Sequence, residues 1–358
     1  MSFDLKKSFI DIFHPESDEN VLIISDEPTE KIKDNPAWRE RRVMAENWHI
    51  MLKELSHEVG FKVLPLIKYP ATGTHNAQLP LEKGEPIKLR DALSQATILL
   101  ALTEYSASAF LIMYSKENSD FRSASMPMIA KRMEETALDV DYYDLMKRCN
   151  ILKDLMTGAV GGIVKFSTGD ECYFDLRYRE VLTDDGQLPR NKKGLKLINL
   201  PCGETAFGPY DGEKENIPSK TEGKIPVYDK GDIVIFNIKN NKIIGVDGEK
   251  TKAEKWNAFF SEDPARANLA EFAFGCNPKA VVWGNVLEDE KAGFHWAFGR
   301  SDHLGGTTSP DKFKSPENVI HQDIVYAKNS PIQITEASIE FPDGKRKVII
   351  SDKEYVVF

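Results

Sequence analysis

Residues 287–299 read LEDEKAGFHWAFG, and a short way downstream residues 321–323 read HQD. Three of the seven histidines of the chain fall between His295 and His321, where an even spread would put roughly half of one. Carboxylates lie beside them, including Glu271 upstream. Imidazoles and carboxylates at this density, among glycines and short apolar runs, indicate a metal site.

Residues 319–326 are predicted to form a strand, in which alternate side chains point to the same face. His321 and Asp323 would then be able to hold one cation together. An imidazole with a carboxylate suits zinc, iron, cobalt or manganese, and the shortage of cysteine argues against a structural zinc site. A lone His-x-Asp is also compatible with a surface strand that carries a charge-paired histidine. The neighbouring Glu271 and His295 favour the metal site.

Three segments resemble the motifs of one family. Residues 287–299 resemble its acid-rich run ending in His-x-Ala-x-Gly, and residues 321–323 its His-x-Asp. Residues 199–204 (NLPCGE), followed by Pro209, resemble its Asn-Leu-Pro-x-Gly-Glu segment. These motifs are similar to those of the aminopeptidase T family of thermophilic metallo-aminopeptidases and its leucyl aminopeptidase-like relatives. The resemblance extends from about residue 95 to about residue 327, and it specifies fold and metal site more closely than substrate.

In that family, acidic and histidine side chains hold divalent ions that activate water for attack on an N-terminal peptide bond. Carried over by position, the resemblance implies these metal ligands: Glu204, Glu271, Glu290, His295, His321 and Asp323. The implied cofactor is one or two divalent ions per chain, of zinc, cobalt, manganese or iron. Carboxylates can bridge and neutralise two cations, and imidazole is a neutral, directional ligand. Glu204 is also a candidate catalytic residue, because a solvated carboxylate would be unusual in its apolar segment.

The chain departs from the family at one active-site position. Seven residues after the motif histidine the peptidases have a tyrosine, and this position is Asp302 here, followed by His303. We predict that His303 is a catalytic residue that donates a hydrogen bond or carries a proton near the reacting group. The alternative is a surface histidine. Arg300 either anchors a substrate carboxylate or pairs with Asp302.

The function that the resemblance implies is a divalent-metal-dependent, aminopeptidase-like hydrolase. Its substrate would be a small molecule or short peptide that carries an amide or an amine. Two related branches leave alternatives open, since one opens hydroxypyridine rings with ferrous iron and oxygen and the other hydrolyses an amino group from a nitroaromatic ring. The ring-opening branch has a histidine at the position of Glu271, which counts against that alternative. A non-catalytic metal-binding protein that keeps the fold is the third alternative.

Composition limits the class of protein further. The chain has 358 residues, of which 41% are hydrophobic and 29% charged, so we expect a globular protein of two domains. The net charge of -9 argues against nucleic acid and anionic membranes as partners. No signal peptide or membrane span is recognisable, and we expect a cytoplasmic homodimer. The four cysteines are scattered, so reduced thiols are expected; Cys202 and Cys276 are either nucleophiles or small apolar fillers.

The first half alternates between strand and helix periodicity, which predicts a Rossmann-like, doubly wound α/β domain at residues 1–158. The predicted strands are residues 21–25, 61–66, 97–103 and 123–126, and the predicted helices are residues 38–59, 89–95, 129–135 and 142–156. No glycine-rich nucleotide loop follows any of these strands. An irregular loop at residues 68–88, which contains His75, either covers an active site or is a surface excursion.

The second half, residues 159–358, is predicted to be a strand-rich α+β metal-binding, catalytic domain that begins after a cluster of glycines. The predicted strands are residues 163–167, 172–178, 233–238, 242–246, 332–341, 347–350 and 355–358, besides residues 319–326. Asn240 and Asn241 are predicted to form a hairpin turn. The few helices are predicted at residues 253–260 and in the residues that lead into Glu271.

Overall fold

The computed structural model describes residues 3–358. These residues divide into two compact units. The first unit extends to Met146 and also includes Asp184–Cys202 and Pro278–Ala280. The second unit consists of Lys147–Thr183, Gly203–Asn277 and Val281–Phe358, so the division falls within helix α5 (Tyr142–Met156).

A parallel sheet forms the centre of the first unit. Its strands are β1 (Asn20–Glu27), β2 (Lys62–Val63), β3 (Ile67–Pro70), β4 (Ile98–Ala101), β5 (Arg122–Ser125) and β9 (Leu197–Asn199). The order is β2-β1-β4-β5-β9, with β3 also paired to β1, and the pairs are parallel. The strand order therefore reverses at β1, as a doubly wound sheet requires. The predicted parallel α/β sheet is confirmed.

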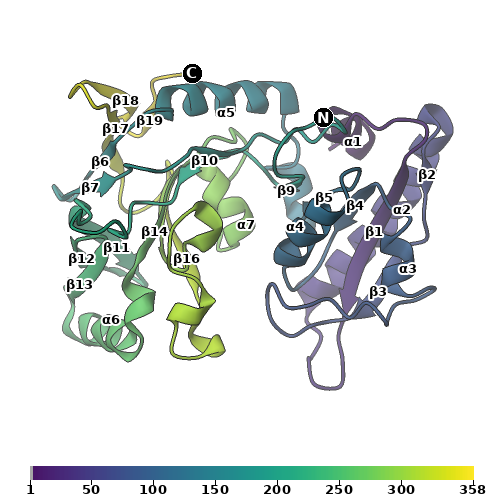
Figure 1. The fold of residues 1–358 in the computed structure, drawn as a ribbon, viewed down its shortest axis with the longest axis horizontal. Helices are drawn as coiled ribbons and strands as arrows, with labels where there is room; N and C mark the ends of the chain where they lie inside the picture. The colour runs from purple at the N-terminus through teal and green to yellow at the C-terminus, as the bar shows by residue number, and fades with distance from the viewer. Residues whose placement is uncertain (1–2) are drawn as a thin grey trace. The chain divides into compact units, whose positions relative to one another are not determined.

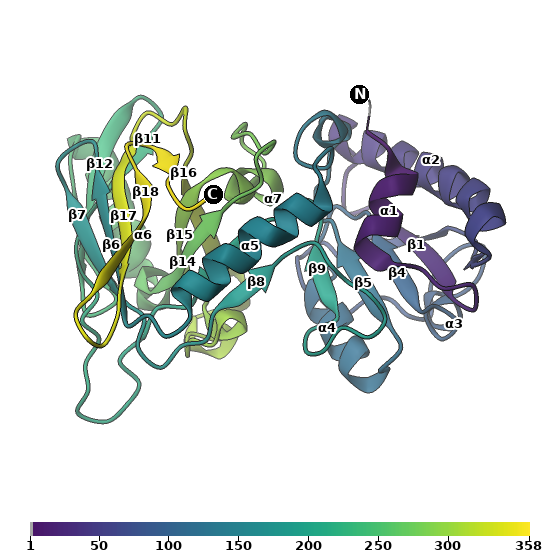
Figure 2. The ribbon, with the colours of Figure 1, turned by 90° about the horizontal axis from the view of Figure 1, so that it is seen from above.

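Helices cover both faces of this sheet. They are α1 (Leu5–Phe13), α2 (Pro36–Val59), α3 (Leu89–Leu93) and α4 (Ser108–Glu117), with the 3-10 helix η1 (Lys131–Glu135). Figures 1 and 2 show α1 and α2 on one face and α3 and α4 on the other. As predicted, α2 ends at Gly60, whose φ of 100° suits glycine. Although α2 runs for 24 residues, no helix within residues 3–358 is long and apolar enough to span a membrane.

Several predicted elements of the first unit were wrong in detail. The single strand predicted at residues 61–66 is replaced by the short strands β2 and β3, because Pro65 between them has no N–H for the ladder. The helix predicted at residues 129–135 is only the 3-10 turn η1. The first residues of the predicted loop 68–88 belong to β3, and His75 Nδ1 accepts a hydrogen bond from the Ser106 N–H at 3.1 Å.

A buried ion pair connects the N-terminal helix region to the sheet. The Arg122 and Glu19 side chains are fully buried, and Arg122 Nη2 lies 2.8 Å from Glu19 Oε2. The same guanidinium donates to the carbonyls of Leu188 and Phe13 at 2.8 and 3.1 Å. Burying a charge is costly unless it is paired and hydrogen-bonded, and this guanidinium has both kinds of partner. The contact with Leu188 helps to explain why residues 184–202 pack with the first unit.

Asp26, at the end of β1, supplies a hydrogen-bond acceptor where β1 and β4 end. Its carboxylate accepts from Trp38 Nε1 at 2.9 Å and from the backbone N–H groups of Glu104 and Tyr105 at 2.7 and 3.0 Å.

We expect Asp26→Ala to lower the free energy of unfolding by about 1–3 kcal/mol, because buried donors lose their partner. Urea denaturation measures this loss. Asp18→Ala is the control, since that exposed aspartate pairs only at the surface with Arg190; equal losses in both variants would contradict the prediction.

The second unit contains two antiparallel sheets. The five-stranded sheet has the order β16-β15-β14-β10-β8, and the eight-stranded sheet has the order β13-β12-β11-β7-β6-β17-β18-β19. The strands of the first are β8 (Leu182–Asp184), β10 (Glu204–Phe207), β14 (Leu269–Gly275), β15 (Phe294–Gly299) and β16 (His321–Tyr326). Those of the second are β6 (Gly161–Phe166), β7 (Glu171–Asp175), β11 (Glu222–Asp229), β12 (Asp232–Lys239), β13 (Lys242–Asp247), β17 (Ile334–Glu340), β18 (Arg346–Ser351) and β19 (Glu354–Tyr355).

Short helices complete the second unit. They are α6 (Lys250–Glu262), α7 (Val286–Asp289) and the 3-10 helices η2 (Pro264–Ala267), η3 (Glu290–Ala292), η4 (Asp302–Leu304), η5 (Pro310–Lys312) and η6 (Pro316–Asn318). The hairpin prediction is confirmed, with Asn240 and Asn241 at φ values of 50° and 62° between β12 and β13. The helix predicted before Glu271 was wrong, because η2 gives way to β14, which contains Glu271.

An aromatic core lies between the two sheets of the second unit. Phe272 of β14 packs against Phe174 of β7 with ring centroids 5.0 Å apart, and Trp296 of β15 packs edge-on against Phe236 of β12. Gly162 of β6 lies beneath the Phe272 ring, and a Cβ there would come within 2.5 Å of it. One face of the five-stranded sheet therefore packs into the aromatic core, and the other face is available for polar side chains.

Candidate metal centre

The register of the five-stranded sheet places the predicted ligands on one face. Residues directly opposite each other in antiparallel strands share a face, and Ala297 of β15 lies opposite both Glu271 and Asp323. His295 and His321 lie two residues from Ala297 and Asp323, so they share this face, and Glu204 joins it from β10. Three alanines, at positions 206, 273 and 297, stand between the polar side chains. These three alanines are buried.

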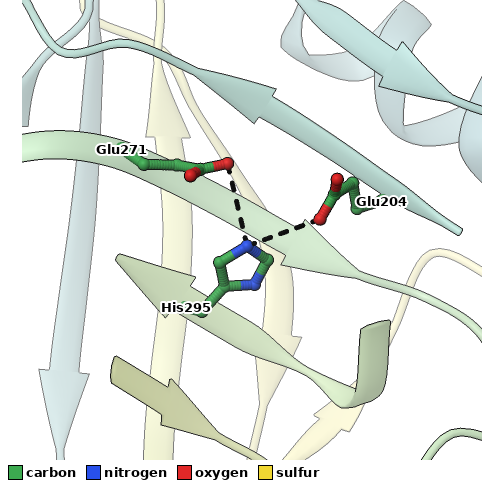
Figure 3. A group of neighbouring side chains, drawn as sticks. All are labelled: Glu204, Glu271 and His295. Carbon is green, nitrogen blue, oxygen red and sulfur yellow. Dashed lines mark ion pairs between the residues drawn. The ribbon is translucent and has the colours of Figure 1, made fainter. Parts of the chain in front are cut away.

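Glu204, Glu271 and His295 form the first of two candidate ligand groups among the described residues. Figure 3 shows both carboxylates turned toward the imidazole. His295 Nε2 lies 3.6 Å from Glu204 Oε2 and 3.8 Å from Glu271 Oε1. These distances are too long for hydrogen bonds. They are close to the spacing of about 3.4 Å between two atoms that bind one Zn²⁺ tetrahedrally.

Glu271, His321 and Asp323 form the second ligand group. His321 Nε2 lies 3.0 Å from Glu271 Oε2 and 3.5 Å from Asp323 Oδ1. His321 Nδ1 lies 2.7 Å from the Arg300 carbonyl oxygen. Because a carbonyl only accepts, Nδ1 carries the proton and Nε2 is the atom directed at the carboxylates. A backbone carbonyl that fixes the tautomer in this way is typical of metal-binding histidines.

Two buried polar atoms in the centre have no hydrogen-bond partner within residues 3–358, namely His295 Nε2 and Asp323 Oδ1. The His295 side chain is 1% exposed and that of Asp323 is 6% exposed. Buried polar atoms normally have partners, so each needs an explanation. One atom belongs to each ligand group. A cation in each group would supply the missing partner, and the nitrogen and oxygen ligands fit zinc, manganese, cobalt or iron.

The carboxylates of the centre favour a positive charge beside them, as the pKa shifts of the two histidines indicate. Burial lowers the pKa of His295, but the carboxylates of Glu271, Glu204 and Asp323 outweigh burial and raise it to about 9. Burial likewise opposes protonation of His321, yet the carboxylates hold its pKa well above the ordinary value. For Glu271, burial raises the pKa, but the two imidazoles outweigh it and hold the pKa well below the ordinary value. A bound cation would replace the imidazole protons, so metal affinity should increase with pH.

Glu290 and Lys291 lie beside the first ligand group. Glu290 belongs to neither ligand group of the described residues. Its Oε1 lies 2.6 Å from Lys291 Nζ, which also lies 2.6 Å from Glu204 Oε1. Burial raises the pKa of Glu290 to about 8. The negative charges of Glu204 and Asp323 also raise this pKa, whereas the positive charge of Lys291 lowers it.

The predicted catalytic residue His303 lies against the second ligand group. Its ring packs edge-on against the His321 ring, with centroids 4.8 Å apart. The His303 side chain is 40% exposed, and its Nδ1 lies 3.9 Å from Asp302 Oδ1. Arg300 pairs with Asp302. Burial raises the pKa of Asp302, but His303 and Arg300 outweigh burial and hold it well below the ordinary value.

Some residues in the acidic run have a structural role. Glu288 and Asp289 are buried, and both accept hydrogen bonds from residues 281–284: Asp289 from the Trp283 and Gly284 backbone at 2.9 Å, and Glu288 from Trp283 Nε1 at 2.6 Å. Cys276 is buried with its sulfur 3.4 Å from that of Cys149, and Cys202 is buried as well. Neither Cys202 nor Cys276 belongs to a ligand group of the described chain.

The sequence did not lead us to predict a role for Lys291, or for the alanines on the face of the five-stranded sheet that carries the candidate ligands. Lys291 stands in a charged run where a solvated lysine is the ordinary expectation, yet its side chain is fully buried. The alanines had a recognisable signal. Residues 271–275 and 294–299 alternate small or polar residues with phenylalanine or tryptophan, which is the period of a strand with one aromatic face.

Comparison with known proteins shows the fold. No family model matches the chain, and no curated protein matches it in sequence. Among solved structures, wild-type AmpT from Thermus thermophilus matches with a TM-score of 0.62 and 15% identity over 98% of both chains. A 2,5-dihydroxypyridine dioxygenase from Pseudomonas putida KT2440 matches with a TM-score of 0.64 and 15% identity over 98% of this chain and 96% of that one. The chain therefore has the fold that AmpT and this dioxygenase share, which agrees in part with the expected resemblance.

Proposed function

We propose that the protein is a divalent-metal-dependent hydrolase with an aminopeptidase-like reaction, acting on a small molecule or short peptide that carries an amide or an amine. The observation that carries this proposal is the pair of ligand groups that share Glu271 on one sheet face. A carboxylate with one oxygen for each of two cations is typical of two-metal hydrolytic sites. The likeness in fold to AmpT supports the same class.

In this proposal the residues of the metal centre would have the following roles. Glu204, Glu271 and His295 would hold one ion, and Glu271, His321 and Asp323 the other. Divalent ions held there would supply Lewis-acid polarisation and activate water near neutral pH. His303 is half-exposed beside His321 and would donate a hydrogen bond to the reacting group. Glu204 would orient its Oε2 toward the ion, since Lys291 occupies its Oε1.

A ring-opening dioxygenase is the second candidate, because one solved structure with this fold is a dioxygenase. Two imidazoles and one carboxylate can hold iron with open positions, as in non-haem oxygenases. The centre has more carboxylates than that arrangement needs, since Glu204 and Glu271 join Asp323 around His295 and His321. The additional negative charge favours the hydrolase, because two divalent ions would neutralise it.

Metal analysis and a substrate panel test the proposal. Protein purified without chelator is expected to contain between one and two divalent transition ions per chain, measured by elemental analysis, because the buried carboxylates need compensating charge. It should then hydrolyse at least one member of a panel of aminoacyl amides, dipeptides and aromatic amines without consuming oxygen. Oxygen uptake with a hydroxypyridine would favour the dioxygenase instead. Protein that binds no Co²⁺ or Zn²⁺ even when these are added would contradict both enzymes.

A further inference from the structure

Lys291 distinguishes the two ligand groups. It belongs to η3, immediately before β15, and its side chain is fully buried. Its ammonium lies 2.6 Å from one oxygen of Glu204 and 2.6 Å from one oxygen of Glu290. A buried ammonium is retained only where paired charges compensate the loss of water. Lys291 therefore places an ammonium group inside the carboxylate cluster.

This charge acts on the first ligand group in particular. Glu204 offers its Oε2 to that group, with His295 Nε2 at 3.6 Å, while its Oε1 pairs with Lys291. An ion bound at Oε2 would share the Glu204 carboxylate with the ammonium, and two positive charges that close together repel each other. Lys291 also engages Glu290, which a nearby ion would otherwise be able to attract.

Among the described residues, no lysine pairs with the second ligand group in the way that Lys291 pairs with Glu204 of the first. Asp323 pairs with His321, and His321 receives its orientation from the Arg300 carbonyl. The guanidinium of Arg300 is directed to Asp302 instead. The two groups thus share Glu271 but differ in the positive charge beside them.

We propose that Lys291 makes the two ion sites unequal: the group with His321 and Asp323 binds one ion tightly, and the group with Glu204 and His295 binds a second ion only weakly. The inference rests on the proposed metal centre and deepens it. Lys291 is a positioning residue in this account, because it restricts Glu204 to one oxygen and supplies part of the charge that a second ion would bring. The protein would then carry one ion at low metal concentration and two only when metal is abundant.

Titration of metal-free protein with Co²⁺ tests the inference. Calorimetry and the visible absorption of bound Co²⁺ should show one tight site and a second site at least about 10-fold weaker, since partners of metal ligands change affinity by about 10- to 100-fold. The Lys291→Met substitution removes the ammonium group and keeps a side chain of similar length. The variant should bind two ions of similar affinity, with the second tightened by about 10- to 100-fold.

Controls assign the sites and guard against misfolding. His321→Ala should remove the tight ion, and His295→Ala should remove only the weak one. Lys165→Met is the matched control, because Lys165 pairs with Glu336 on the surface of the eight-stranded sheet; its titration should equal that of the parent. If Lys291→Met does not fold, the Glu290→Gln/Lys291→Met double variant removes the ammonium together with the carboxyl group that it pairs with, and should show the same two similar sites.

The outcomes separate this inference from the proposed function. Two equal sites in the parent, or an unchanged second site in Lys291→Met, would overturn the role of Lys291 and leave the metal centre standing. A parent protein that binds no Co²⁺ would overturn the proposed function itself.

Discussion

A Glu271→Gln variant is expected to lose one of two Co²⁺ ions, to hold the other weakly, and to lose turnover on the order of 10³-fold or more, as expected when transition-state charge stabilisation is removed. Each oxygen of Glu271 serves a different ligand group. Oε1 lies 3.8 Å from His295 Nε2, and Oε2 lies 3.0 Å from His321 Nε2. Glutamine keeps the shape of the side chain but replaces one of these oxygens with an NH₂ group, which cannot bind a cation.

The measurement is metal content at a Co²⁺ concentration that fills both groups in the parent, together with turnover of the best substrate from the panel. Glu336→Gln is the matched control, because this partly exposed carboxylate of β17 pairs with Lys165, away from the ligand groups. It should retain both ions and full turnover. A Glu271→Gln variant with the parent's two ions would show that Glu271 is not the shared ligand and that the two groups are independent of it.

Local patterns predicted the parts of the fold in which one segment carries its own signal. The apolar run of β1 and the capped end of α2 at Gly60 were recognisable in the sequence. So was the alternation in residues 321–323, and the structure places His321 and Asp323 on one face. Such features depend on the intrinsic periodicity of a strand or helix.

Other elements could not be predicted because tertiary contacts decide them. Strand β9 consists of only three residues and joins the parallel sheet far along the chain from β5. Helix α1 has nine residues, too few to be stable without packing. The residues that lead into Glu271 were predicted to form a helix, but the structure has the short 3-10 helix η2 and then the start of β14 there. The apolar residues Leu269 and Ala270 by themselves fit a buried helix and a buried strand equally well.

The candidate site was predictable as a set of residue types but not as a geometry. The family resemblance brought Glu204 and Glu271 into the same proposal, although 67 positions separate them (271 minus 204). The division into two groups around Glu271 follows from the register of β10, β14, β15 and β16, which no local pattern encodes. The place of Lys291 inside the cluster likewise depends on burial, which charge patterns in the sequence do not reveal.

A His303→Ala variant is expected to keep its metal and to lose turnover by about 10²-fold or more, the usual range for a general acid, base or hydrogen-bond donor. The structure places His303 beside the second ligand group. The His303 ring packs against His321, a proposed ligand, yet 40% of its side chain stays exposed, so a substrate could approach it. The Gly305 turn that follows, at a φ of 83°, holds this segment in a tight conformation.

Turnover and Co²⁺ content measured on the same preparations decide between three roles for His303. Loss of turnover with unchanged metal content would support a direct role at the reacting group. Loss of metal in parallel would make His303 a ligand, and unchanged turnover would make it a surface histidine without a part in the reaction. His57→Ala is the matched control, because His57 is an exposed histidine of α2 in the first unit. A loss of similar size in that control would mean that the His303 effect does not arise from its place beside His321.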